Sequence, residues 1–326
     1  MTSAYRTPHD APKSEGPVVV SVRGLVAAYD EEVALRVASL DFRAGLVHGI
    51  IGPNGAGKST LLRAIAGLLP PARGAVTVAG VDLYATPPER WPRVGYMPDN
   101  TPVYDKLTAR EWLALWARGE GAPGRIEGAL RRVGMAAYGA RPAGALSLGM
   151  RQRLGLARLL VMDAPVALLD EPANGMDPDA RAMLGEVLRA EAARGAAVLV
   201  SSHVLHELDA VCDRFVVIHR GRLAGEGTPQ ELAGDESPGA LVRVELDGLD
   251  ADSRERAAAA LSLVEGASLV RAEADALLVR TRGGRAARAE VVRALVADGL
   301  AVCGVAEERP HIASVYAQLT TPGARP

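Results

Sequence analysis

A glycine-rich run in the first fifth of the chain has the residue types and spacing of a phosphate-binding loop. Residues 52–60 read Gly-Pro-Asn-Gly-Ala-Gly-Lys-Ser-Thr, which fits the pattern G-x-x-x-x-G-K-[ST], and they follow an apolar run at 47–51. Glycines let backbone N–H groups close around a phosphate, and a helix that begins here adds a favourable dipole. Lys58 would place its charge on the β- and γ-phosphates of a nucleotide, and the Ser59 hydroxyl would ligate Mg²⁺. We predict that the nucleotide contacts Gly52, Pro53, Asn54, Gly55, Ala56, Gly57, Lys58, Ser59 and Thr60.

Two carboxylates follow a second apolar run and complete a candidate hydrolytic site. The run 166–169 ends in Asp170 and Glu171, at the carboxyl end of an expected buried strand beside the phosphate loop. Asp170 would hold the Mg²⁺ shell, and Glu171 would orient or deprotonate the attacking water. Each motif has an ordinary alternative, a glycine-rich turn before a core helix or a strand with a polar exit. Their occurrence together favours the nucleotide site.

The segments around these motifs alternate between short apolar runs and helix-like stretches. Apolar spacing predicts a helix over residues 59–69, which stops at Pro70, and a further helical pattern covers residues 108–117. Near-continuous apolar runs between helices are typical of buried parallel strands. The sequence therefore predicts an α/β fold. The expected strands are 18–22, 47–51, 76–78, 166–169, 196–200 and 215–218.

Changes in composition divide the chain into a tail and two domains. Residues 1–16 are polar and proline-rich and predict a disordered tail, while the loop-like stretch 228–239 marks a boundary. We predict a nucleotide-binding domain over residues 17–230, whose helical part covers about 100–160, and a small α+β domain over 238–326. The expected elements of the second domain are strand 241–246, helix 253–263, strands 267–271 and 276–281, helix 286–297, strand 300–305 and helix 312–319.

Three further motifs and one tyrosine occur in a fixed order along residues 18–230. Residues 146–153 read Leu-Ser-Leu-Gly-Met-Arg-Gln-Arg, 174–178 read Asn-Gly-Met-Asp-Pro, and 201–203 read Ser-Ser-His. With Tyr29 before the phosphate loop, they resemble the signature, D-loop, switch histidine and adenine-stacking aromatic of the nucleotide-binding subunits of ATP-binding cassette (ABC) transporters. The resemblance implies a P-loop domain of the ABC type, with a mixed sheet core and a helical subdomain.

The resemblance also implies a composite site between two chains. Two cassettes would face head to tail, with ATP and Mg²⁺ held between the phosphate loop of one and Ser147 and Gly149 of the other. At a helix N-terminus, Ser147 would direct its hydroxyl and the helix dipole at the γ-phosphate. Glu171 and His203 would be the catalytic residues, and Asp177 would belong to the nucleotide site through the D-loop. One chain alone should therefore be a poor ATPase.

One departure from the family's motifs concerns the metal site. Residues 95–98 read Gly-Tyr-Met-Pro and lead to Asp99, where the family usually has glutamine. We predict that Asp99 joins Ser59 and Asp170 as a metal or water ligand and contacts the membrane partner, because a carboxylate is a harder ligand than an amide. A solvated turn residue is the alternative. Leu148 and Met150 also depart from the usual signature but replace neither the Ser147 hydroxyl nor the Gly149 backbone.

Composition indicates which classes of partner and which cellular compartment suit the chain. Its 326 residues have 48% hydrophobic and 23% charged residues, which is ordinary for a folded protein of about two domains. A net charge of −2 and 4% aromatic residues do not favour nucleic acid, and two cysteines favour a reducing compartment. The chain is expected in the cytoplasm, on the cytoplasmic face of the membrane through its permease.

The resemblance implies a second copy or a paralogous ATPase subunit and integral membrane permease subunits as partners. Residues 101–117 and the terminal stretch 312–320 resemble the exporter branch that serves drug and polysaccharide efflux. Two alternatives stay open at this point. The chain could serve an importer, or it could be a soluble ABC ATPase that acts on ribosomes or DNA.

Overall fold

The computed structural model describes residues 16–30, 32–117, 122–204, 208–233, 240–282, 284–307 and 312–320. Apart from Gly16, the tail predicted for residues 1–16 lies outside these ranges. The chain divides into two compact units, one of Met1–Thr228 with Tyr316–Pro326 and one of Pro229–Val315. None of the helices within the described ranges is long and apolar enough to cross a membrane.

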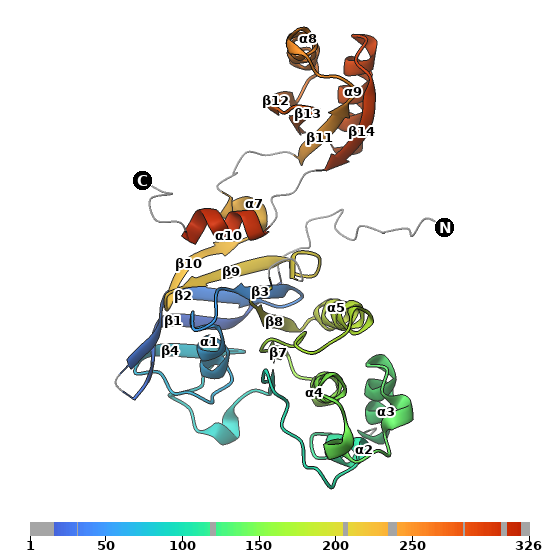
Figure 1. Ribbon diagram of the computed structural model, residues 1–326. Coiled ribbons are helices and arrows are strands. Elements are labelled where there is room, and N and C mark those ends of the chain that lie inside the picture. Colours follow the sequence, from blue (N-terminus) through green and yellow to red (C-terminus); the bar gives the residue numbers. More distant parts are fainter. Residues whose placement is uncertain are drawn as a thin grey trace. The chain divides into compact units, whose positions relative to one another are not determined.

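The first unit is built on a ten-stranded mixed sheet (Figure 1). The strand order is β5-β4-β1-β2-β10-β9-β3-β8-β7-β6. The middle of the sheet is parallel, because β3 pairs with β8 and β9, and β7 pairs with β6 and β8. The strands are β1 (Val18–Tyr29), β2 (Glu32–Arg43), β3 (Val47–Ile51), β4 (Arg73–Val78), β5 (Val81–Asp82), β6 (Val94–Met97), β7 (Val166–Leu169), β8 (Ala197–Ser202), β9 (Arg214–His219) and β10 (Arg222–Gly227).

Strands β1, β2, β4 and β5 pair antiparallel with one another and form the antiparallel arm of this sheet, which is longer than predicted. Strand β1 continues past residue 22 to Tyr29 and pairs along its length with β2 and β4. Exposed and buried positions alternate along β1 and β2, so these strands bury one face and lack the continuous apolar runs that marked the parallel strands. The arrangement confirms the predicted α/β fold with a mixed sheet core.

Helix α1 (Lys58–Ile65) lies in the core between the antiparallel arm and the parallel strands. Leu61, Leu62 and Ile65 are fully buried against both parts of the sheet. The helix is shorter than the predicted 59–69, because Gly67 adopts φ +75°, a left-handed conformation in which an α-helix ends. Residues 52–57 of the phosphate loop connect β3 to α1, so the loop lies at the carboxyl end of a parallel strand.

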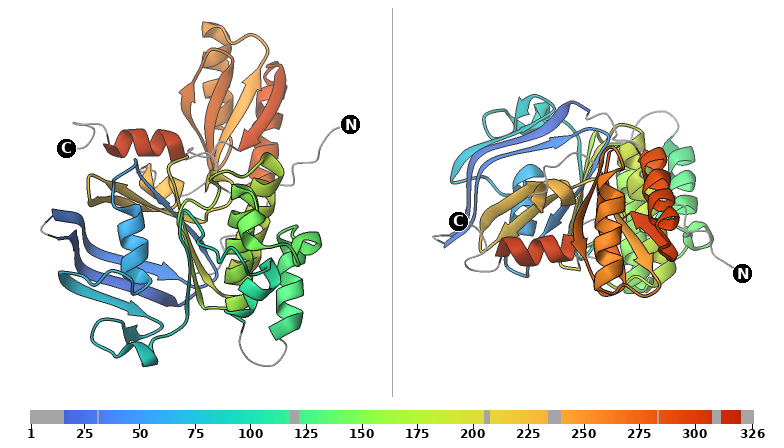
Figure 2. Two further views of the ribbon diagram at one scale, coloured as in Figure 1. Left: turned by 60° about the horizontal axis from the view of Figure 1, so that its bottom comes forward. Right: turned by 90° about the horizontal axis from the view of Figure 1, so that it is seen from above.

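A group of helices lies beside the edge strand β6, opposite the antiparallel arm (Figure 2). Thr108 and Glu111 form a capping box that starts α2 one residue into the predicted 108–117. Ser147 caps α4, and Asp177 caps α5, each by accepting a hydrogen bond from a backbone N–H three residues on. The helices are α2 (Ala109–Ala114), α3 (Ala122–Arg132), α4 (Leu148–Met162) and α5 (Pro178–Ala193), with 3₁₀ turns at Pro88–Arg90, Ala136–Tyr138 and Ala143–Ala145.

The second unit has the order β-α-β-β-α-β after the short helix α7, which is the ferredoxin-like arrangement. Its four-stranded sheet runs β12-β13-β11-β14 with every neighbouring pair antiparallel. Helices α8 and α9 pack on one face of this sheet around a core that includes Val279, Leu261 and Leu295. The elements are α7 (Pro229–Leu232), β11 (Ala240–Leu246), α8 (Ala251–Ser262), β12 (Ala267–Ala272), β13 (Ala276–Thr281), α9 (Gly284–Ala297), β14 (Val302–Glu307) and α10 (Ile312–Thr320), whose residues from Tyr316 on belong to the first unit.

Candidate active site

An open cavity of about 450 Å³ lies over the phosphate loop and brings most of the predicted site residues together. The residues that line it come from parts of the chain that are far apart in the sequence. Gly52 begins the phosphate loop, and a Cβ atom there would come within 2.2 Å of the Ile218 carbonyl oxygen, so only glycine fits. The lining residues are Tyr29, Ala34, Asn54, Gly55, Ala56, Gly57, Lys58, Ser59, Thr60, Asp99, Glu171, Asn174 and His203.

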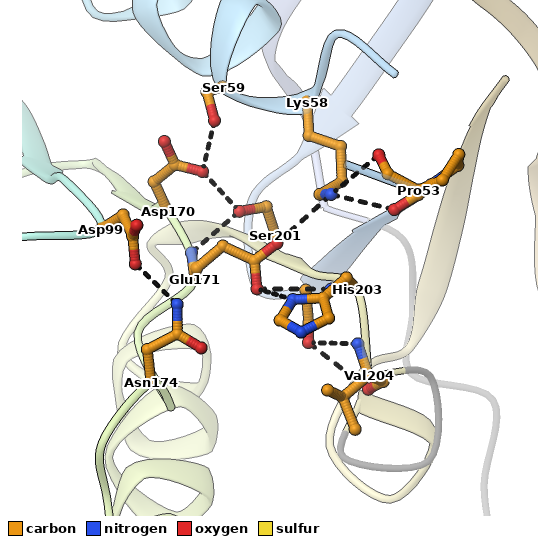
Figure 3. A network of polar contacts seen from close by, with 12 residues as sticks. Pro53, Lys58, Ser59, Asp99, Asp170, Glu171, Asn174, Ser201, His203 and Val204 are labelled. Carbon is orange, nitrogen blue, oxygen red and sulfur yellow. Dashed lines mark hydrogen bonds and ion pairs between the residues drawn. The ribbon is translucent and has the colours of Figure 1, made fainter. Parts of the chain in front are cut away.

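Lys58 is held inside the loop by oxygen atoms. Its Nζ donates hydrogen bonds to the carbonyl oxygens of Gly52 at 2.9 Å and Pro53 at 3.3 Å. The same nitrogen lies 3.2 Å from Glu171 Oε1 (Figure 3), and only 6% of the lysine side chain and 11% of the glutamate side chain are exposed. An almost buried ammonium is therefore paired with an almost buried carboxylate beside the cavity.

The Asp170 carboxylate is buried and oriented by two hydroxyl groups. Its Oδ1 accepts hydrogen bonds from Ser59 Oγ at 2.9 Å and from Ser201 Oγ at 2.7 Å (Figure 3). Ser201 in turn accepts a hydrogen bond from the backbone N–H of Glu171 at 2.9 Å. Because β7 and β8 pair in parallel, their carboxyl ends place Ser201 beside the acidic pair.

Glu171 connects the phosphate loop with His203. The imidazole Nδ1 of His203 lies 2.8 Å from Glu171 Oε2, and the His203 backbone N–H donates to the same oxygen at 3.3 Å. The other carboxylate oxygen, Oε1, is buried and accepts no hydrogen bond, although it lies near Lys58. Glu171 also adopts φ +47°, in the left-handed region that costs a non-glycine residue about 1 kcal/mol. A residue in a strained conformation whose carboxylate lies beside the cavity is typical of a catalytic group.

Tyr29 is hydrogen-bonded by Arg63 of α1. Its side chain is 41% exposed at the mouth of the cavity, and Arg63 Nη1 donates to its hydroxyl oxygen at 3.1 Å. The hydrogen bonds with Tyr29 and Tyr96 raise the pKa of the Arg63 guanidinium. Burial, followed by the charge of Asp170, raises the pKa of the Tyr96 phenol, whose oxygen lies 3.5 Å from Asp170 Oδ2. The hydrogen bond holds the Tyr29 side chain at the mouth of the cavity, and its stacking on adenine stays a prediction.

Asp99 lies at the edge of the cavity, and its side chain has a partner. Its Oδ1 accepts a hydrogen bond of 2.6 Å from Asn174 Nδ2 (Figure 3). Its backbone carbonyl oxygen accepts a hydrogen bond from Gln152 of α4. The structure therefore brings Asp99 to the cavity with Ser59 and Glu171, and its role as a metal ligand stays a prediction.

Three predicted residues lie elsewhere, on a second cavity of about 460 Å³. Ser147, Gly149 and Asp177 line this cavity together with Arg153 and Tyr138. Arg153 Nη2 lies 3.2 Å from Asp177 Oδ2, so α4 and the start of α5 are joined by an ion pair. The single chain does not bring these residues to the phosphate loop, and the part of Ser147 and Gly149 in a partner's site stays a prediction.

The residues around the phosphate loop suit a magnesium ion. Ser59 and Asp170 offer a hydroxyl and a carboxylate oxygen that already face each other at 2.9 Å. Mg²⁺ prefers such hard oxygen ligands, takes one or two carboxylates from a protein and fills its other positions with phosphate oxygens and water. In the described part of the chain, no group of three His, Cys, Asp or Glu could hold a metal ion. The donor set therefore fits a metal that arrives with a phosphate ligand.

Sequence reasoning assigned no role to Ser201, Asn174 or Arg63, which the structure places in hydrogen-bond contact with Asp170, Asp99 and Tyr29. Ser201 could have been found, because it stands at the end of a strand expected beside the strand of Asp170. The other contacts join segments 75 and 34 residues apart, and no local pattern marks such pairs.

Comparisons with known proteins agree on one family. The family model described as "ABC transporter" matches residues 35–174. The Daunorubicin resistance ATP-binding protein DrrA3 of Streptomyces coeruleorubidus is 33% identical over 92% of this chain and 95% of its own length. The Nod factor export ATP-binding protein I of Ralstonia nicotianae is 35% identical over 72% of this chain and 74% of its own length. A solved ATP-binding subunit of an ABC transporter superposes with a TM-score of 0.63 at 30% identity, over 68% of this chain and 95% of that one.

Proposed function

This chain belongs to the ATP-binding proteins of ABC transporters, and from this premise we propose how its own residues bind and hydrolyse ATP. The phosphate loop holds the β- and γ-phosphates through backbone N–H groups and Lys58. Tyr29, fixed by Arg63, stacks on the adenine. Ser59 and Asp170 hold Mg²⁺, which when bound neutralises charge on the phosphates.

Glu171 is the residue that acts on the attacking water. The observation that carries this assignment is the position of its carboxylate between Lys58 and His203, with Oε1 3.2 Å from Lys58 Nζ at the phosphate loop. When a phosphate takes over Lys58, this oxygen is free to accept a proton from the water that attacks the γ-phosphorus. His203 orients the other oxygen of Glu171 from 2.8 Å, and it hydrogen-bonds the γ-phosphate of bound ATP.

Hydrolysis requires a second cassette. Ser147 and Gly149 lie on a different cavity from Lys58, so one chain leaves the γ-phosphate without the N-terminus of α4. In a head-to-tail dimer, the partner's α4 supplies its N-terminal N–H groups and dipole to that phosphate. Asp177 stands at the N-terminus of α5 beside this surface.

The test is ATP hydrolysis as a function of protein concentration, with the mass followed by light scattering. Wild-type activity should rise faster than linearly with concentration, and the Glu171→Gln variant should form a dimer that retains ATP. Linear activity from a persistent monomer would refute the composite site. It would leave a P-loop ATPase with a single complete site.

We further propose that the chain powers export through separate integral membrane permease subunits, at the cytoplasmic face of the membrane. The names of two relatives, one in Nod factor export and one in daunorubicin resistance, support the direction of transport. Co-purification from gently solubilised membranes tests the partner. Recovery of a permease supports transport, whereas recovery of ribosomes or DNA contradicts it.

A further inference from the structure

A chain of side-chain contacts joins helix α4 to the loop that carries Glu171. Gln152 of α4 is fully buried, and its Nε2 donates to the backbone carbonyl oxygen of Asp99. The Gln152 Oε1 accepts a hydrogen bond of 3.2 Å from the hydroxyl of Thr101, which is 2% exposed. A buried glutamine with both ends satisfied fixes the segment 99–101 against α4.

Asp99 connects segment 99–101 to the loop that carries Glu171. Its side chain accepts the 2.6 Å hydrogen bond from Asn174, and the Asn174 backbone N–H donates to the carbonyl oxygen of Glu171 at 3.2 Å. Figure 3 shows Asn174 and Asp99 facing each other beside Glu171. A bond of this length between an amide and a carboxylate is a charge-assisted hydrogen bond, roughly twice as strong as a neutral one.

The same helix holds the other end of the loop. Arg153, the residue after Gln152, pairs with Asp177 at 3.2 Å. The loop between β7 and α5 is therefore held by α4 at Asp177 directly and at Asn174 through Asp99. Because Glu171 sits in this loop at φ +47°, surrounding contacts must keep it in a conformation that it would not adopt alone.

We propose that the Asp99–Asn174 hydrogen bond is a latch that positions Glu171, and that Asn174 is a positioning residue for hydrolysis. The latch rests on the proposed function, because it acts through the residue assigned to the attacking water. It gives Asp99 a role through its hydrogen bond to Asn174 and not through the metal. A movement of segment 99–101 or of α4 would then shift Glu171 through the Asp99–Asn174 hydrogen bond.

A reciprocal exchange of the two side chains tests the latch. Asn174→Asp alone places two carboxylates together and should break the contact. Adding Asp99→Asn restores a hydrogen bond with donor and acceptor exchanged. Gln230→Glu is the matched control, since it makes the same change of charge at a partly exposed residue of α7 that lies outside the latch.

The readouts are kcat and KM for ATP and hydrogen exchange of the amides at 171–177 in the nucleotide-free full chain. Asn174→Asp should lower kcat roughly tenfold to hundredfold, as expected for a hydrogen bond to a charged group, with KM changed less than about threefold. Exchange at 171–177 should speed up by roughly tenfold. The double variant should recover most of both losses, and Gln230→Glu should match the wild type.

A double variant no better than Asn174→Asp would overturn the latch, and so would wild-type values for Asn174→Asp. If Asp99 acts only on the metal, every variant with Asp99→Asn needs more Mg²⁺ and none is rescued, which also overturns it. A wild-type chain that hydrolyses no ATP would instead refute the proposed function. The exchange rates would still decide whether the latch exists.

Discussion

Removing the charge of Glu171 should strengthen nucleotide binding while it abolishes hydrolysis. In the nucleotide-free chain, Glu171 Oε1 lies 3.2 Å from Lys58 Nζ and occupies the lysine that a phosphate must reach. At an effective dielectric constant of about 20, the gross attraction of such a pair is about 5 kcal/mol, most of which desolvation offsets. To bind, the phosphates of ADP must displace Glu171 from Lys58 and so overcome the net attraction that is left in this ion pair.

Glu171→Gln leaves Lys58 with neutral oxygen partners only, the carbonyl oxygens of Gly52 and Pro53 and the glutamine amide oxygen. A nearly buried ammonium without a counter-charge is unfavourable, so the free chain is destabilised relative to the complex. With a net gain of about 1–2 kcal/mol, the affinity for ADP should rise about fivefold to thirtyfold. Use of ADP without Mg²⁺ keeps a trapped ATP dimer from contributing.

The assay is a fluorescence titration with a labelled ADP at a concentration where light scattering shows a monomer. Glu127→Gln is the matched control, because Glu127 pairs with Arg110 at 2.6 Å on the surface, where an ion pair contributes little. Unchanged or weaker ADP binding by Glu171→Gln would refute the reasoning. It would mean that Lys58 is equally available to phosphate with and without Glu171.

Two further predictions concern His48 and Arg63. Burial lowers the pKa of His48 to about 4, so the unfolded chain takes up a proton first as the pH falls below 6.5. Stability should therefore decrease from pH 7 to pH 5, and His48→Gln should remove about 2 kcal/mol of that decrease in urea unfolding. Arg63→Gln frees the Tyr29 hydroxyl and should weaken ADP binding about fivefold, with partial recovery in Arg63→Lys.

Each of these predictions has its own control and contrary outcome. His219→Gln, at a partly exposed histidine of β9, should keep the acid sensitivity of the wild type. A His48→Gln chain with the same pH dependence as the wild type would show that another group causes it. Arg73→Gln, at an exposed arginine of β4, should bind ADP normally, and equal affinities for it and Arg63→Gln would contradict the support of Tyr29.

The central parallel strands β3, β7, β8 and β9 could be predicted to within two residues, whereas only parts of the antiparallel strands β1 and β4 could be predicted, and β2 could not. The observed β3 and β7 have the predicted bounds 47–51 and 166–169, because all their positions are buried and the sequence runs are continuous. Strand β2 exposes every second or third position, so its apolar residues are interrupted by polar ones and no run stands out. Long pairing with β1 makes it a strand.

In the candidate site, too, residues of contiguous sequence motifs could be predicted, whereas contacts between distant loops could not. Lys58, Ser59, Asp170 and Glu171 belong to contiguous motifs, and their neighbourhood follows from strands that end at one edge of a sheet. The contact between Asp99 and Asn174 depends on how two loops 75 residues apart meet over α4. Such a pairing is a property of the packed tertiary structure, which no local spacing in the sequence records.

The left-handed backbone of Glu171 has a consequence for how this chain can change over evolutionary time. Glycine or asparagine would occupy φ +47° more cheaply, so loss of the carboxylate would recover about 1 kcal/mol of conformational strain. The ion pair with Lys58 opposes this gain, because a nearly buried ammonium without its counter-charge is unfavourable. Replacement of Glu171 by glycine would therefore relieve the backbone and destabilise the nucleotide-free phosphate loop at the same time.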